Sequence, residues 1–143
     1  MPAFGNKSLD KLKTCHPDIQ KVMLEAIKEV DFTVICGVRT PDEQFELYKQ
    51  GRTLQDGKWI KTGATVTNID GKSKKSEHNY TPSRAIDIAP YPIDWNNTKR
   101  FLDLSKVVLR VAKELGIDLD WGGDWTSFKD YPHYELGKSY AKY

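Results

Sequence analysis

The segment Ser76–Asp87 reads SEHNYTPSRAID and carries the strongest structural signal in the chain. Its last residues open a short apolar run over residues 84–89, which is typical of a buried strand and is closed by prolines that cannot continue a ladder. Asp87 lies between Ile86 and Ile88, so it is a lone charge in this strand. Burying a carboxylate without a partner is very costly. We therefore expect Asp87 to be paired or bound to a metal ion.

Two of the three histidines stand beside acidic residues: His78, within the segment above, and His133, within the stretch DYPHYE over residues 130–135. A hydrolytic zinc site takes three protein ligands and leaves one position open for water. Two neutral imidazoles and one carboxylate leave a net positive charge, which favours ionisation of a bound water near neutral pH. We expect His78, Asp87 and His133 to hold Zn²⁺. The alternative for these side chains is an ordinary polar network at a strand end.

A peptidase of this kind also needs a carboxylate that does not bind the metal, takes a proton from water and passes it to the leaving amine. Asp130 lies three residues before His133 and is our candidate for this general base. Its alternative role is to cap a turn beside Tyr131-Pro132. Glu135 is the rival base, because a residue two positions past His133 in a strand would share its face.

The wording of these segments resembles the zinc peptidases of peptidoglycan, which include D-alanyl-D-alanine peptidases and the phage endolysins that cut the L-alanyl-D-glutamate bond. The family pattern is Ser-x-His, Ala-x-Asp and a late acidic-x-x-His, and the chain carries it as residues 76–78, 85–87 and 130–133. The segment GVRT over residues 37–40, with the helix that follows, and WGGDW over residues 121–125 match two further family elements. The interval between His78 and Asp87 is longer than in the commoner form, and many relatives have glutamate where this chain has Asp130.

The resemblance assigns roles to further residues. Arg39 resembles the family arginine that steadies the substrate carbonyl and the developing oxyanion, a kind of preorganised charge that often contributes most to catalysis; its alternative is a surface ion pair. We expect Gln44 and Ser76 to make hydrogen bonds around the site, although both could be simple caps. Three aromatic residues could line a substrate cleft, although aromatic residues in a small domain are more often core: Tyr80, Trp125 and Tyr134.

Hydrophobic spacing predicts helices over residues 17–30 and 95–115, the second ending at Gly116. Thr40, followed by proline and then Glu43, indicates the start of a helix that runs to about Gln50. We expect strands over residues 31–38, 84–89, 117–121 and 131–136, and a hairpin around Trp59 to Val66. This is an α+β plan, a small, mostly antiparallel sheet packed with helices, and the resemblance implies the hedgehog/DD-peptidase fold.

The length of 143 residues fits a single zinc peptidase domain over residues 1–143. With 22 basic and 20 acidic residues, the net charge of +2 gives no reason to infer a nucleic-acid partner. We expect a monomer that does not enter a membrane, because no apolar stretch is long enough to span one. Cys15 and Cys36 are expected to be free thiols. Because the first residues lack the apolar region of a secretory signal, we expect the chain to remain in the cytoplasm of the producing cell and to act on the cell wall after release.

These features together predict a phage endolysin that hydrolyses the L-alanyl-D-glutamate bond of the peptidoglycan stem peptide. One alternative is a D-alanyl-D-alanine carboxypeptidase or dipeptidase. A second is a non-catalytic module that binds the cell wall and contains a purely structural zinc, as in the amino-terminal domain of hedgehog proteins.

Overall fold

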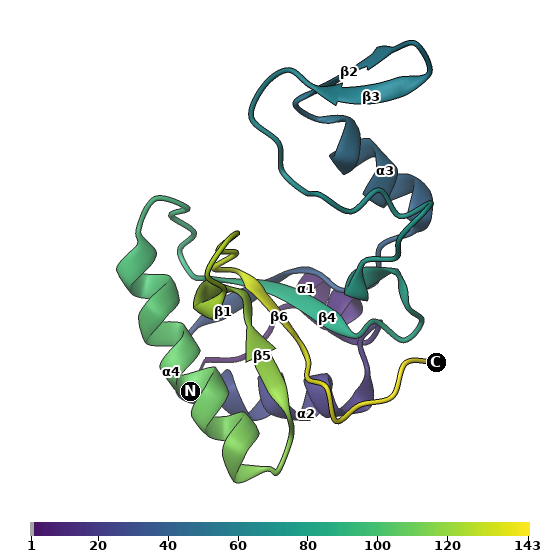
Figure 1. Cartoon of the computed structure of the whole chain (residues 1–143). Helices are drawn as coiled ribbons and strands as arrows, with labels where there is room; N and C mark the ends of the chain where they lie inside the picture. Colours follow the sequence, from purple (N-terminus) through teal and green to yellow (C-terminus); the bar gives the residue numbers. More distant parts are fainter. Residues whose placement is uncertain (1) are drawn as a thin grey trace.

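The computed structural model describes residues 2–143, which form a four-stranded antiparallel sheet with the strand order β1-β4-β6-β5 (Figure 1). The strands are β1 (Phe32–Cys36), β4 (Ala85–Pro90), β5 (Leu119–Trp121) and β6 (His133–Leu136). Helices α1 (Asn6–Leu12), α2 (Pro17–Ala26) and α4 (Thr98–Glu114) pack with this sheet. The α+β class with a small antiparallel sheet is confirmed. In the described part of the chain, no helix combines the length and the apolar character that crossing a membrane requires.

The core lies between one face of the sheet and helices α2 and α4. Both helices bury their apolar stripes, as the spacing predicted. Along β4 and β6, successive side chains point to opposite faces of the sheet. The face toward the core carries Ile86, Ile88, Tyr134 and Leu136. Asp87, His133 and Glu135 therefore occupy the opposite face of the sheet, which the helices leave free.

Local sequence signals account for the ends of the helices. The helix α3 (Pro41–Lys49) begins at a complete capping box, in which the Thr40 side chain accepts from the Glu43 N–H and the Glu43 side chain accepts from the Thr40 N–H. Helix α4 ends just before Gly116, whose φ of 71° is a left-handed conformation that glycine adopts without strain. Helix α2 is shorter than the predicted 17–30, and α4 is shorter than the predicted 95–115.

The predicted hairpin is wrong in position. Strands β2 (Arg52–Gln55) and β3 (Lys58–Lys61) form it, and the intervening Asp56-Gly57 turn has positive φ at both residues, 50° and 76°. Asp-Gly is a favoured sequence for such two-residue turns because both residues tolerate that conformation. Helix α3 and this hairpin form a lobe that stands away from the sheet (Figure 1). Helix α1 was not predicted.

Candidate metal centre and cavity

The antiparallel pairing of β4 with β6 brings two of the predicted ligands together. Asp87 is directly opposite His133 in the ladder, so their side chains emerge side by side on the free face of the sheet. His78 comes from η1 (Glu77–Asn79), a single turn of 3₁₀ helix. The Ser76 hydroxyl caps this turn by accepting from the His78 N–H at 3.3 Å. Ser76 is thus a cap, one of the two roles that its sequence allowed.

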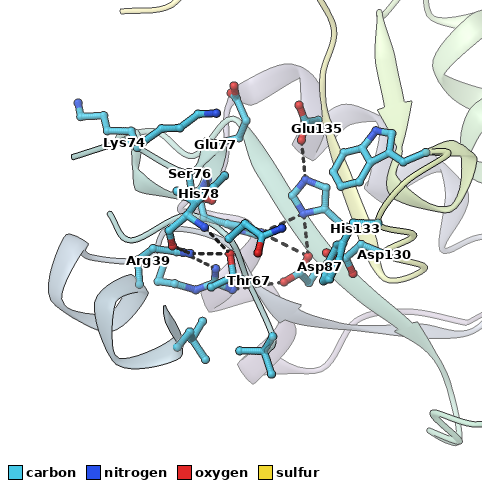
Figure 2. A pocket seen from close by; sticks show the side chains of 18 of the residues that line it. Arg39, Thr67, Lys74, Ser76, Glu77, His78, Asp87, Asp130, His133 and Glu135 are labelled. Carbon is cyan, nitrogen blue, oxygen red and sulfur yellow. Dashed lines mark hydrogen bonds and ion pairs between the residues drawn. The ribbon is translucent and has the colours of Figure 1, made fainter. Parts of the chain in front are cut away.

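The three predicted ligands converge on one point (Figure 2). His78 Nε2 lies 3.3 Å from Asp87 Oδ1 and 3.3 Å from His133 Nδ1, and His133 Nδ1 lies 3.2 Å from Asp87 Oδ1. A tetrahedral zinc ion with bonds of about 2.0–2.1 Å holds its nitrogen and oxygen ligands roughly 3.3 Å apart. The three atoms therefore have the spacing that such an ion requires.

The hydrogen bonds on the far side of each imidazole fix which nitrogen is free. His78 Nδ1 donates to the Gly37 carbonyl at 2.7 Å, which leaves Nε2 without a proton in the neutral ring. His133 Nε2 donates to Glu135 Oε1 at 2.7 Å, which leaves Nδ1 free in the same way. Histidines that bind metals commonly make such an outer hydrogen bond. Both lone pairs and the Asp87 carboxylate therefore point at the same place.

The point between His78, Asp87 and His133 favours a positive charge. Burial alone would lower the pKa of each histidine, but the charge of Asp87 and its hydrogen bonds outweigh burial and raise both pKa values. Burial alone would likewise raise the pKa of Asp87, yet the charge of His78 and the hydrogen bonds of both histidines hold it far below its usual range. A carboxylate between two buried imidazoles is stabilised by a cation, and a divalent metal ion can supply that charge.

Asp130 lies at the edge of this cluster. One of its carboxylate oxygens lies within 4.8 Å of a ligand atom of Asp87 and of His133. Burial raises the pKa of Asp130 and the charge of Asp87 raises it further, while His133, His78 and Arg39 oppose the shift. Glu135, the rival base, is hydrogen-bonded to the outer nitrogen of His133 instead.

Close packing of the Trp-Gly-Gly-Asp-Trp stretch positions Asp130. The N–H of Asp130 donates to the Gly122 carbonyl at 3.0 Å. A Cβ atom on Gly122 would lie 2.4 Å from the Asp130 carbonyl oxygen, so only glycine allows this approach. Trp125 follows on the same stretch and packs its ring against the His133 imidazole, with 5.2 Å between centroids.

Arg39 reaches the other side of the cluster and is held at several points. Its Nη2 donates to Asp87 Oδ2 at 3.4 Å and to the Cys36 sulfur at 3.5 Å, while Nη1 donates to Gln44 Oε1 at 2.8 Å. The Gln44 amide in turn donates to the Ile69 carbonyl at 2.9 Å. Gln44 is almost fully buried, and because its amide is held by the Ile69 carbonyl, it orients the Arg39 guanidinium.

These residues form one end of a cavity of about 480 Å³. Arg39, Gln44, Ser76, Trp125 and Asp130 line it together with the three predicted metal ligands. The sequence did not single out four apolar residues that also line it, namely Leu47, Val66, Ile69 and Phe128. Leu47 comes from α3, Val66 and Ile69 from the loop after β3, and Phe128 from the loop after Trp125, so only the folded chain brings them together.

Two predicted aromatic contacts are placed elsewhere. Tyr134 is fully buried beneath the sheet, where its ring stacks on Trp121, because strand alternation turns it away from His133. Tyr80 packs against Tyr143 of the C-terminal tail, with 5.8 Å between ring centroids. Neither is among the described residues that line the cavity. Cys15 and Cys36 are both free thiols, as expected. The Cys36 sulfur lies within 4.8 Å of ligand atoms of His78 and Asp87.

Known proteins are similar to this chain over most of its length. The family model for phage L-alanyl-D-glutamate peptidases matches residues 2–140. The L-alanyl-D-glutamate peptidase of Escherichia phage T5 is 34% identical over 133 residues, which cover 90% of this chain and 85% of that enzyme. The peptidoglycan L-alanyl-D-glutamate endopeptidase CwlK of Bacillus subtilis is 39% identical over 123 residues, 78% of this chain and 64% of that protein.

Among solved structures, the crystal structure of the L-Ala D-Glu endopeptidase ChiX of Serratia marcescens superposes with a TM-score of 0.70. The match covers 94% of this chain and 90% of ChiX, at 26% sequence identity. The likeness therefore extends over almost the whole sheet, its helices and the lobe.

Proposed function

The chain belongs to the family of phage L-alanyl-D-glutamate peptidases, and we propose from this premise that it is a zinc peptidase that cleaves the L-alanyl-D-glutamate bond of the peptidoglycan stem peptide. The observation that carries the zinc assignment is the triangle of ligand atoms. His78 Nε2, Asp87 Oδ1 and His133 Nδ1 are 3.2–3.3 Å apart, each with its lone pair directed inward. Nitrogen and carboxylate ligands in this number and spacing fit Zn²⁺ and leave a position open.

The ion, when bound, supplies Lewis acidity that polarises the scissile carbonyl and acidifies water. The side chains of the protein do the rest. Asp130 takes a proton from the attacking water as the new C–O bond forms at the alanyl carbonyl. The same carboxyl then gives a proton to the departing D-glutamyl nitrogen as the C–N bond breaks, which leaves a free amine and a carboxylate.

Arg39 complements the negative charge that develops on the carbonyl oxygen. Its guanidinium is fixed by Gln44 and Asp87 before any substrate arrives, so little reorganisation is needed during the reaction. When a substrate fills the cavity, Trp125, which packs against the His133 ring, and the apolar lining side chains displace water from around it. A charge of this kind acts more strongly when water is excluded.

Digestion of purified peptidoglycan tests this proposal, with the new amino termini identified by mass spectrometry. We expect a new D-glutamate amine, no release of free D-alanine, and loss of the reaction in the presence of a chelator. Added Zn²⁺ should restore it. Release of D-alanine, or full activity after the metal content has been brought to zero, would overturn the assignment.

A further inference from the structure

Three lysines line the cavity outside the cluster of predicted metal ligands. Figure 2 shows Lys74 on the side of the cavity away from Asp130, and Lys75, Lys142 and Glu77 also line the cavity. Glu77 already has two cationic partners, because Arg84 Nε donates to it at 2.7 Å and Lys142 Nζ at 3.0 Å. Its negative charge is therefore offset, and the charges of Lys74 and Lys75 remain uncompensated among the described residues.

The lysines lie on a loop that is fixed in place. Asp70 Oδ1 accepts from the backbone N–H groups of Lys72 and Ser73 at 2.9 Å and of Lys74 at 3.2 Å. The Ser73 hydroxyl also donates to Asp70 at 2.6 Å, and these bonds lower the pKa of Asp70 to about 2. Asp70 is therefore ionised at neutral pH, and its carboxylate accepts all four of these bonds.

The loop also separates its lysines into two kinds. Lys72 points away from the cavity and pairs with Asp42 at the start of α3. Lys74 makes no side-chain hydrogen bond or ion pair within residues 2–143, and Lys75 only lies over the Tyr80 ring, with Nζ 4.8 Å from its centroid. Both Lys74 and Lys75 are exposed to solvent and line the cavity. They are therefore free to meet a ligand.

The chemistry of the substrate indicates what that ligand is. On the acyl side of the L-alanyl-D-glutamate bond, the alanine is joined through a neutral amide to the lactyl group. On the leaving side, the D-glutamate is linked onward through its γ-carbon and keeps a free α-carboxylate, and a diaminopimelate at the next position adds another. All the negative charge of the stem peptide therefore lies on the side of the departing amine.

We propose that Lys74 and Lys75 determine specificity by binding a carboxylate of the stem peptide on the leaving-group side of the scissile bond. This assignment rests on the proposed function and gives the substrate a direction: its departing half extends from Asp130 toward the loop. Each lysine acts as an exposed cation toward an anion, so its effect falls as ionic strength rises.

Three synthetic stem peptides test the assignment. The first carries the free α-carboxylate of D-glutamate followed by diaminopimelate, the second has that carboxylate as a carboxamide, and the third has lysine in place of diaminopimelate. The variants are Lys74→Met and Lys75→Met, with Lys74→Arg to retain the charge. Lys72→Met is the matched control, because this lysine comes from the same loop but lies outside the cavity.

We expect each methionine variant to lose about fivefold in kcat/KM on the first peptide, the upper end for an exposed ion pair, mainly through KM. Lys74→Arg should restore the value, Lys72→Met should match the parent protein, and the loss should shrink in high salt. The loss should also vanish on whichever of the other two peptides lacks the recognised carboxylate, which identifies its source.

Equal losses on all three peptides, or no loss on any, would overturn the assignment while leaving the proposed peptidase intact. If the parent protein cleaves none of the peptides and none of the intact wall, the proposed function fails, and the role of the lysines fails with it.

Discussion

Asp87 shows how one residue organises the site. Its two carboxylate oxygens face different partners: Oδ1 faces His78 and His133, and Oδ2 faces the Arg39 guanidinium. The carboxylate is therefore surrounded by groups that favour its charge, although it lies in a strand whose neighbours Ile86 and Ile88 are completely buried. Asp87 therefore contacts both histidines of the proposed zinc site and the Arg39 guanidinium.

Replacing Asp130 tests the base. We expect Asp130→Asn to retain bound zinc and to lose about 10²–10⁴-fold in kcat, the usual contribution of a positioned acid–base group. Metal analysis and steady-state kinetics on a stem peptide measure the two quantities. Asp10→Asn, at an exposed position on α1, is the control. An Asp130→Asn protein with near-normal kcat would remove Asp130 from the mechanism.

Replacing Glu135 distinguishes its role from that of Asp130. Because Glu135 accepts from the outer nitrogen of His133, we expect Glu135→Gln to weaken zinc binding about 10–100-fold. At saturating zinc, kcat should stay close to that of the parent protein. Competition with a chromogenic chelator gives the affinity. Unchanged affinity with a kcat lowered a thousandfold would instead make Glu135 the base.

At the scale of elements, two segments outside the sheet keep residues of the site in position. The turn η1, which carries His78, is tied to the C-terminal tail through Arg84, whose side chain is only 2% exposed. Besides Glu77, this guanidinium binds the carbonyls of Ala141 at 2.9 Å and Tyr140 at 3.1 Å. Arg84 lies in the interval between His78 and Asp87, which is longer than in the commoner family pattern. It thus links the C-terminal tail to the turn that carries His78.

Removing this buried cation should destabilise the fold strongly. We expect Arg84→Met to lower the free energy of unfolding by about 3–5 kcal/mol, because Glu77 loses its nearest partner and two carbonyls lose their donor. Urea unfolding at neutral pH measures the change. Arg110→Met breaks only exposed ion pairs, with Glu114 on α4 and with Glu29 after α2, and should cost at most about 1 kcal/mol. Equal effects for the two variants would contradict the proposed role of Arg84.

The second segment is the glycine pair before Trp125. A methyl group on Gly122 would displace the backbone of Asp130, so we expect Gly122→Ala to reduce kcat at least tenfold while the zinc content stays stoichiometric. Gly5→Ala is the matched control, because a Cβ there meets nothing within 4 Å. Gly122→Ala protein with full activity would show that Asp130 tolerates the shift.

At the scale of the whole molecule, the sheet separates stability from chemistry. One face packs on α2 and α4, and the other carries Asp87 and His133, two of the proposed metal ligands. The cavity forms where this lobe, the loop of Lys74 and the stretch after Trp121 meet over the free face. Each wall of the site thus comes from a different part of the chain.

Much of this arrangement follows from local patterns in the sequence. The lone charge of Asp87 between isoleucines indicated a paired or metal-bound carboxylate, and the capping box at Thr40 located the start of α3. Strand alternation placed Glu135 on the face of His133, and the same rule turns Tyr134 toward the core. Tyr134 therefore lies in the core and not in the cleft where it was expected.

Other features depend on contacts that no local pattern specifies. The Asp56-Gly57 turn is a recognisable hairpin signal, but the flanking strands are short, polar and largely exposed, so they lack the apolar alternation that marks most strands. The apolar cavity residues come from separate segments of the chain, and they meet only in the folded protein, as does Cys36 with His78 and Asp87. The pairing of Lys72 with Asp42, 30 positions apart, likewise arises only in the folded chain.

Anomalous diffraction at the zinc absorption edge, from crystals grown with added Zn²⁺, tests the central claim most directly. We expect one strong peak per chain, about 2.0–2.2 Å from His78 Nε2, His133 Nδ1 and an Asp87 oxygen. A zinc peak elsewhere, or no peak between these three side chains in crystals that contain the metal, would contradict the account.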